Sequence, residues 1–297
     1  MGSVRIALAL AVAVAAAVTA CSGSGPPARP AATAAPASYY LALGDSLSQG
    51  VQPDAAGTSV ETAQGYPDQL YAVLHRSRPT LRLVKLGCPG ETTGTMIRGG
   101  ICHYSDGSQL AAAAAFLTAH RGHIFLVTID IGANDPEDCG SVASIRSIAS
   151  CAGTGLPQAV TNLADILARL RAAGGAGVRI VGMNYYLPAL AEWRSGVTGQ
   201  AVAWVSERLA AGYNDALEGA YTAAGVRVAN VSGAFYTSDF GNRMTVPGVG
   251  TVPRNVALIC QWTWACADPP RGPNQHANQA GYGVIARAFL STDGLAG

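Results

Sequence analysis

Short apolar runs alternate with longer segments of helical spacing along most of the chain. Five runs, bounded by glycine or polar residues, have the length and apolar content of buried strands: 39–43, 81–86, 124–131, 178–183 and 226–228. Between and after them, apolar positions recur with an α-helical period in residues 65–77, 108–120, 157–173, 198–224 and 278–290. Strands that alternate with helices are typical of a mostly parallel sheet with helices on both faces. The pattern therefore predicts an α/β fold around a mostly parallel five-stranded sheet.

The first part of the chain departs from this alternation. Arg5, an apolar run and small residues before Cys21 predict a secretory signal peptide over residues 1–20, which is too short to span a bilayer comfortably. The junction "VTAC" resembles a bacterial lipobox, after which Cys21 would become the lipidated N-terminus; an ordinary cleaved signal with an incidental Cys21 is the alternative. The Pro- and Ala-rich residues 22–38 are typical of a solvated spacer. We therefore expect an exported lipoprotein with one folded domain over residues 39–297.

The charge of the chain helps only to exclude one class of partner. The chain has 19 basic and 18 acidic residues, and no basic stripe is visible along it. This balance argues against a nucleic-acid partner. The length left after the spacer is ample for one α/β core, and no internal linker or repeat divides it. We expect a monomer that is held at the membrane through its N-terminal lipid anchor, and the spacer would let the domain stand off the membrane or fold back onto it.

The cysteines support export. Apart from Cys21, six cysteines form three local pairs in the sequence: Cys88 and Cys102, Cys139 and Cys151, Cys260 and Cys266. Sequential pairing is the simplest of the fifteen possible connectivities. A zinc site is the competing interpretation, but the spacings lack paired C-x-x-C units, and an exported protein favours disulfides. We expect three disulfides and no metal.

Small polar groups follow the first three predicted strands. Gly44, Asp45 and Ser46 follow the first strand, "GCPGETTG" (residues 87–94) the second and "GANDPEDC" (residues 132–139) the third. Because the carboxyl ends of parallel strands meet at one edge of a sheet, these loops should open on the same edge. Ser46 is either the cap of a following helix or a nucleophile, and a nucleophilic serine needs a base.

One histidine suits the role of that base. Of the five histidines, His276 lies in a loop just before the last predicted helix, which Asn278 should cap. An acyl-transfer site must also bind the oxygen of a tetrahedral intermediate through N–H donors. The backbone N–H groups of Ser46 and Gly90 and the side-chain amide of Asn134 are candidates for this oxyanion hole. Each of these residues, taken alone, has an ordinary structural role as a cap or turn residue.

The four blocks together resemble the GDSL/SGNH hydrolase family. Gly44–Leu47, Gly90, Gly132-x-Asn134-Asp135 and a late histidine occur in the order of that family's signature, over residues 39–291. The resemblance implies a three-layer α/β/α flavodoxin-like fold, with Ser46 as nucleophile and His276 as general base. It also implies the oxyanion hole of Ser46, Gly90 and Asn134. "KLGCPGETT" and "CQWTWAC" look like the extracellular actinobacterial lipase/esterase branch, in which three local disulfides are usual.

The last block departs from the family pattern. The family usually has Asp-x-x-His, which would place an aspartate where this chain has Pro273. The imidazole needs an acceptor at its other nitrogen to fix its tautomer. Asp268, folded back from the preceding loop, and a backbone carbonyl within residues 271–273 are the two candidates, and we favour the carbonyl.

These residues predict a serine esterase or lipase that hydrolyses small-molecule or lipid carboxylic esters through an acyl-enzyme, without a cofactor. Two alternatives use the same scaffold: a glycan- or lipid-binding surface lipoprotein without activity, and an acyltransferase. The aromatic segment 231–273 either lines an acyl pocket or packs over the sheet.

Overall fold

The computed structural model describes residues 37–135 and 145–292, apart from the side chains of residues 145–155. All of these belong to one compact unit, Pro36–Gly297. The predicted lipidation site Cys21 lies outside the described residues, and so does the predicted disulfide Cys139–Cys151, because Cys139 and the side chain of Cys151 are not described. The disulfides Cys88–Cys102 and Cys260–Cys266 are present, as expected.

A five-stranded sheet forms the centre of this unit. Its strands are β1 (Ser38–Gly44), β4 (Leu81–Lys85), β5 (Ile124–Asp130), β6 (Ile180–Met183) and β7 (Arg227–Ala229). They run in the order β4-β1-β5-β6-β7, and every neighbouring pair is parallel. The predicted sheet is therefore confirmed. Since all strands run in the same direction, their amino ends lie along one edge of the sheet and their carboxyl ends along the opposite edge.

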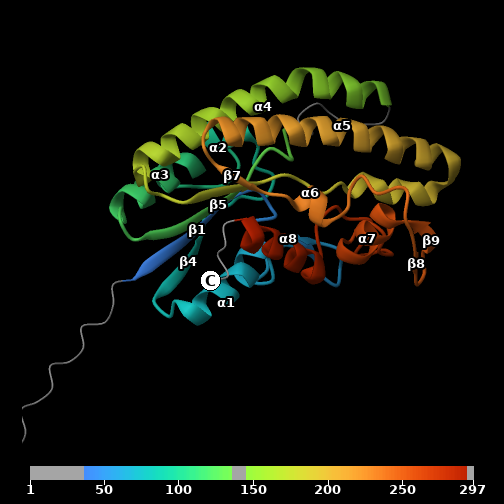
Figure 1. The fold of residues 1–297 in the computed structure, drawn as a ribbon, viewed down its shortest axis with the longest axis horizontal. Helices are drawn as coiled ribbons and strands as arrows, with labels where there is room; N and C mark the ends of the chain where they lie inside the picture. Colours follow the sequence, from blue (N-terminus) through green and yellow to red (C-terminus); the bar gives the residue numbers. More distant parts are fainter. Residues whose placement is uncertain (1–36, 136–144, 293–297) are drawn as a thin grey trace, which may run out of the picture. The chain divides into compact units, whose positions relative to one another are not determined.

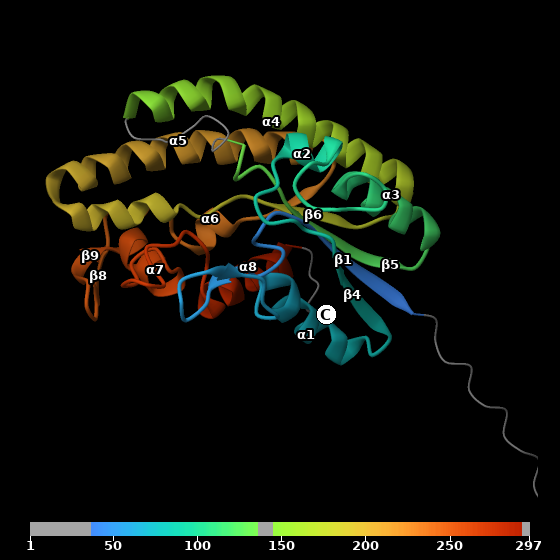
Figure 2. The same ribbon diagram turned by 180° about the vertical axis from the view of Figure 1, so that it is seen from behind.

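Helices cover both faces of the sheet (Figures 1 and 2). α1 (Tyr66–Ser77) and α8 (Gln279–Thr292) pack together on one face. α3 (Gln109–Ala119), α4 (Ile145–Gly174) and α5 (Gly196–Ala223) pack on the other. This is the predicted three-layer α/β/α arrangement. α4 begins well before the predicted residue 157 because Pro157, a residue typical of a helix start, lies inside the helix.

Several elements were not predicted because they are short. They are β2 (Gln52–Pro53), β3 (Ser59–Val60), α2 (Thr93–Arg98), the 3₁₀-helix η2 (Pro188–Ser195), α6 (Val231–Ala234), β8 (Arg243–Val246), β9 (Gly250–Pro253) and α7 (Arg254–Trp262). In Figure 1, α6, α7 and the β8–β9 hairpin lie beyond the end of the sheet opposite to where β1 begins. The aromatic segment 231–273 therefore contains two short helices and a hairpin.

The core lies between the sheet and its helices. β1 is buried from Tyr40 to Gly44, as a central strand covered on both faces should be. The ring of Tyr66 on α1 stacks on Phe289 of α8, with centroids 4.8 Å apart, which joins the two helices under the sheet. Within the described residues, no helix is long and apolar enough to cross a membrane.

Candidate active site

The turn after β1 carries Ser46 at the carboxyl edge of the sheet. Gly44 has φ +130°, and a Cβ there would lie 2.0 Å from the carbonyl oxygen of Asp130, so only glycine fits. The Asp45 N–H donates to that same carbonyl at 3.0 Å. Turns and bends follow Ser46, and α1 begins only at Tyr66. Ser46 therefore caps no helix, and its side chain is left for another role.

Ser46 and His276 meet although 230 residues separate them in sequence. Nε2 of His276 lies 2.9 Å from the Ser46 hydroxyl oxygen. The histidine is held just before α8, where the Asn278 side chain accepts the Gly281 N–H at 3.1 Å and caps the helix, as predicted. His276 is 9% exposed. A serine hydroxyl and a histidine nitrogen at this distance have the geometry of an activated nucleophile and its base.

The other ring nitrogen of His276 contacts the side chain of Asn274. Asn274 Oδ1 lies 2.8 Å from Nδ1 and accepts the backbone N–H of His276 at 3.0 Å. The backbone N–H can only donate, which identifies this amide atom as the oxygen, so Nδ1 must carry the proton. Nε2 is then unprotonated and can accept the proton of Ser46.

This contact corrects the expected orientation of His276. The acceptor at Nδ1 is neither Asp268, which is exposed, nor a backbone carbonyl of residues 271–273. It is the amide of Asn274, which directly follows Pro273. The sequence signal was present, because an asparagine lies two residues before the histidine, but the family pattern points to a carboxylate three residues before it.

Burial controls the charge of the histidine. Desolvation lowers the pKa of His276 from its ordinary value of 6.5 to about 4. Asn274 is a neutral acceptor, so it orients the ring without the negative charge that would raise this pKa. The imidazole is therefore neutral at pH 7, as a general base must be.

The expected oxyanion donors lie on adjoining loops. Gly90 is exposed, with φ +83°, and a Cβ there would meet nothing within 4 Å. In the part of the chain that the structure describes, the backbone N–H groups of Ser46 and Gly90 have no backbone acceptor. The Asn134 amide donates to the Glu91 carbonyl at 2.9 Å, directly beside Gly90. An amide nitrogen carries two hydrogens, so the second remains available to a ligand.

Gln109, which the sequence did not single out, joins the first two of these loops. This fully buried side chain accepts the Gly44 N–H at 2.7 Å and donates to the Gly44 carbonyl at 2.9 Å. It also donates to the Glu91 carboxylate at 3.0 Å. Gln109 is the first residue of α3, and a polar side chain is common at that position, so the sequence does not distinguish it. It nevertheless fixes the turn before Ser46 relative to the residue after Gly90.

The buried carboxylate of Asp130 holds the turn that carries Ser46. One of its carboxylate oxygens lies 3.2 Å from the N–H groups of Asp45 and Ser48, and the other accepts the Tyr66 hydroxyl at 2.5 Å. Burial and the nearby charge of Asp45 raise the pKa of Asp130 well above its ordinary value. Asp130 is an acidic residue inside the predicted strand 124–131. This exception to the apolar pattern indicates a role for the side chain, but the sequence analysis did not identify it.

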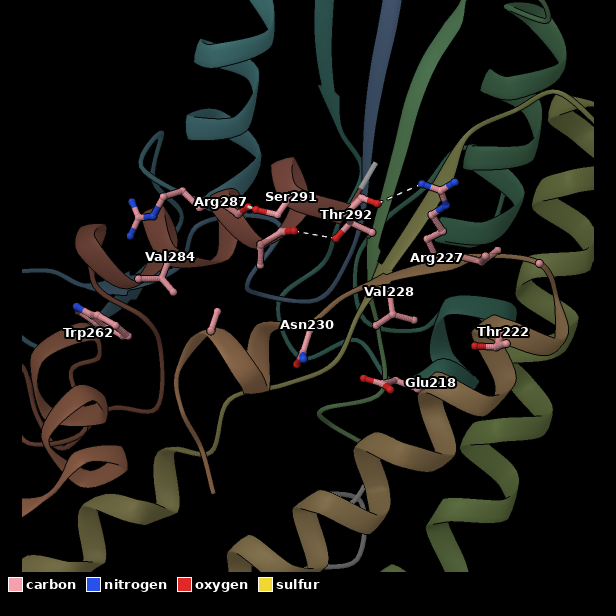
Figure 3. Close-up of a pocket in the computed structure, with 14 residues that line it drawn as sticks. Glu218, Thr222, Arg227, Val228, Asn230, Trp262, Val284, Arg287, Ser291 and Thr292 are labelled. Carbon is pink, nitrogen blue, oxygen red and sulfur yellow. Dashed lines mark hydrogen bonds between the residues drawn. The ribbon is translucent and has the colours of Figure 1, made fainter. Parts of the chain in front are cut away.

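The aromatic segment 231–273 contributes to packing at the edge of the molecule. Phe235 is fully buried, stacks on Tyr186 with centroids 4.7 Å apart and meets the edge of Trp262 at 5.2 Å. Trp262 also lines a cavity of about 960 Å³ along β7, together with residues of α5 and α8 (Figure 3). Neither Ser46 nor His276 lines this cavity. Among the described residues, no cluster of His, Cys, Asp or Glu side chains could hold a metal ion.

Solved structures share this fold at low sequence identity. An extracellular lipase from Streptomyces rimosus (TM-score 0.57) and a phospholipase A1 from Streptomyces albidoflavus (TM-score 0.54) are each 18% identical; the alignments cover 86% of this chain and 100% of theirs. A variant acetyl-xylooligosaccharide esterase from Geobacillus is 16% identical, with a TM-score of 0.50, and the alignment covers 86% of this chain and 93% of that one. No curated protein matches the sequence.

A family model matches most of the chain. The model of the GDSL-like lipase/acylhydrolase family covers residues 42–283, from within β1 into α8. Ser46, Gly90, Asn134 and His276 all lie inside this range. The chain therefore belongs to the GDSL-like lipase/acylhydrolase family.

Proposed function

We propose that this protein is a serine hydrolase that cleaves carboxylic esters through an acyl-enzyme on Ser46. The observation that carries the proposal is the line of contacts from the Ser46 hydroxyl to Nε2 of His276 and from Nδ1 of His276 to Asn274. Membership in the family supports an esterase or lipase activity.

The residues divide the work of the reaction as follows. Nε2 of His276 takes the proton of Ser46 as its oxygen attacks the ester carbonyl. The carbonyl oxygen becomes negative and is stabilised by the N–H groups of Ser46 and Gly90 and by the Asn134 amide. His276 then gives its proton to the leaving alcohol, and the acyl group remains on Ser46. Water, deprotonated by the same histidine, releases the acid.

The proposal includes an exported, membrane-anchored protein and lipid-like esters as substrates. The signal-like residues 1–20 and the lipobox-like junction before Cys21 support export and anchoring. The fold is shared with a lipase and a phospholipase A1, which supports an ester with an acyl chain. We expect the enzyme to act as a monomer.

The test is turnover of p-nitrophenyl esters from acetate to palmitate by the chain from Ser22 onward. We expect activity that is lost in Ser46→Ala and retained in the matched control Ser291→Ala, which removes an exposed hydroxyl on α8. A fluorophosphonate should label the parent protein and the control but not Ser46→Ala. Lack of labelling in the parent would overturn the proposal and favour the binding lipoprotein.

Hydrolysis and acyl transfer are separated by their products. With a long-chain alcohol added, a hydrolase releases mainly free acid, whereas an acyltransferase forms mainly the new ester. Predominant ester formation in water would replace the proposed hydrolysis by transfer.

A further inference from the structure

The segment that follows Ser46 returns to the side chain that orients His276. It contains β2 and β3, which pair as an antiparallel hairpin, and we call residues 50–62 the β2–β3 hairpin. Ser59 is the first residue of β3 and is exposed. Its hydroxyl oxygen accepts the side-chain amide N–H of Asn274 at 3.2 Å. Ser59 therefore contacts the same amide group whose oxygen accepts the Nδ1 proton of His276.

The side-chain contacts of Asn274 use both ends of its amide. The oxygen accepts the ring and backbone N–H groups of His276, and the nitrogen donates to Ser59. Asn274 and His276 are only two residues apart, so the bonds between them fix the shape of one loop but not its place in the molecule. The bond to Ser59 joins this amide to a different segment of the chain, and it therefore fixes where the amide lies relative to the rest of the site.

The turn of the β2–β3 hairpin is held in one shape and lies against the loop that carries the catalytic histidine. The Asp54 carboxylate accepts the Thr58 N–H at 2.9 Å, and the Asp54 N–H donates to the Thr58 carbonyl at 2.9 Å. Gly57 has φ +88°, and a Cβ there would lie only 2.1 Å from the carbonyl oxygen of Pro270, so the turn packs closely on that loop. Ser59, directly after the turn, is thereby kept beside the loop.

Trp264 makes a second connection between the β2–β3 hairpin and this loop. Its indole N–H donates to Oε1 of Gln52 on β2, at 3.4 Å. Its backbone carbonyl accepts the Asn274 N–H at 3.1 Å, and its own backbone N–H donates to the His276 carbonyl at 3.0 Å. The backbones of both Asn274 and His276 are therefore bonded to a tryptophan whose side chain contacts the hairpin.

The two ends of the β2–β3 hairpin are attached to the framework of the domain. At its start, the Val51 N–H donates to the Ser46 carbonyl at 3.1 Å. At its end, Lys85, the only lysine of the chain, donates to the Thr62 carbonyl at 3.2 Å and to the Asp68 carboxylate of α1 at 3.1 Å. A hairpin held at both ends can act as a support for the residues that it contacts.

We propose that Ser59 is a positioning residue for the catalytic base and acts through Asn274. This rests on the proposed function, because it assigns Ser59 a part in the ester hydrolysis carried out by Ser46 and His276. The contacts form a closed path, which runs along the chain from Ser46 to Ser59 and returns through Asn274 and His276 to the Ser46 hydroxyl. The segment that carries the nucleophile therefore also orients the base. Without the Ser59 hydroxyl, the Asn274 amide is free to move, and the imidazole spends less time with Nε2 at Ser46.

The contact between Ser59 and Asn274 lies at the surface, so water can replace a lost hydroxyl. Water satisfies the Asn274 amide but is not attached to the β2–β3 hairpin, so it does not hold the amide in place. The expected effect is therefore that of one ordinary hydrogen bond, a factor of about five, rather than the larger loss expected when Asn274 itself is removed.

A double-mutant cycle on the chain from Ser22 onward tests the proposal. Ser59→Ala should lower kcat for p-nitrophenyl acetate by about fivefold with little change in KM, because the hydroxyl acts on the base rather than on the bound ester. In the Asn274→Ala background the same change should cause no further loss, since the amide through which Ser59 acts is absent. Ser59→Thr keeps a hydroxyl and should retain most of the activity. The matched control Thr58→Ala removes the exposed hydroxyl of the preceding residue and should keep the kcat of the parent.

The tautomer of His276 provides a readout that does not depend on activity. ¹⁵N NMR of the ring, assigned with His276→Gln, should show the proton on Nδ1 in the parent and in Thr58→Ala, and a larger share of the Nε2-protonated form in Ser59→Ala. An unchanged tautomer or kcat in Ser59→Ala, an equal loss of kcat in Thr58→Ala, or a further fivefold loss in the double variant would overturn the proposal. A parent without esterase activity whose His276 tautomer still responds to Ser59→Ala would contradict only the proposed hydrolase function.

Discussion

Asn274 accepts two hydrogen bonds from His276, one from the ring at 2.8 Å and one from the backbone N–H at 3.0 Å. The first holds the ring with its unprotonated nitrogen toward Ser46, and the second fixes the amide of Asn274 itself. A neutral oxygen selects the tautomer as well as a carboxylate does. It gives less stabilisation to the positive imidazolium that forms during attack, because it has no net charge.

Replacing Asn274 should separate these two effects. Asn274→Ala removes the acceptor and should lower kcat by about 10- to 100-fold, less than the loss of the general base itself would, because His276 remains and only its orientation is lost. Asn274→Asp should raise the pKa of His276 and move the acid limb of kcat/KM upward by about one unit or more. Asp268→Asn is the control, and a loss of activity in it comparable to that of Asn274→Ala would return the orienting role to Asp268.

The pH profile of the parent enzyme reports the buried state of His276. With its pKa near 4, the histidine is protonated, and so unable to act as a base, only below about pH 4. We expect kcat/KM to stay constant from pH 7 to about pH 5 and then to fall about tenfold per unit below pH 4. An acid limb centred near 6.5, the ordinary histidine value, would show that the imidazole is solvated in the working enzyme.

The sheet and the main helices could be predicted because their signals are local. An apolar run such as 124–131 must be buried, and strict alternation with helical segments leaves few ways to bury it. The short elements after α5 gave no such signal, because four-residue strands and helices such as β8 and α6 are stabilised by contacts rather than by their own sequence.

The contact between Ser46 and His276 was predictable, but the residues that position the two side chains were not. Ser46 and His276 are chemical types that stand out, and the family pattern joins them across the chain. Gln109, Asp130 and Asn274 act through contacts that only the folded chain creates. Asn274 in particular supplies from two residues away the acceptor that the pattern places at Pro273.

Asn134 provides a direct test of the oxyanion hole. Asn134→Ala should lower kcat by about 10²- to 10³-fold with a small change in KM, because its amide acts on charge that develops in the transition state. The loss of its hydrogen bond to the Glu91 carbonyl should cost only about 1 kcal/mol of the free energy of unfolding. Steady-state kinetics and urea unfolding measure the two effects. A KM increase with unchanged kcat would instead assign Asn134 to substrate binding.

Gln109 should matter for activity although it lies away from the reacting atoms. Gln109→Leu keeps much of the volume but leaves both backbone groups of Gly44 without their side-chain partner. We expect a loss of about 2–4 kcal/mol in the free energy of unfolding and at least a tenfold lower kcat, since the Ser46 and Gly90 loops lose their shared support. Gln158→Leu, on the exposed side of α4, is the matched control. Unchanged kcat in Gln109→Leu would make the residue purely structural.

Asp130 makes the stability of the fold depend on pH. Its pKa is raised by burial and by Asp45, so the folded state binds a proton that the unfolded state releases above about pH 3.8. Its contribution to stability is therefore full below that pH and is lost as the pH rises through the raised folded pKa.

Asp130→Asn cannot ionise, and its oxygen can still accept the N–H groups of Asp45 and Ser48. The free energy of unfolding of Asp130→Asn, measured with urea, should therefore rise relative to the parent between pH 4 and pH 8, with kcat retained. Asp130→Leu, which leaves those N–H groups unpaired, should lose about 2–5 kcal/mol at every pH. A difference between the parent and Asp130→Asn that stays constant across this range would show that the Asp130 carboxyl has the same proton affinity in the folded and unfolded states.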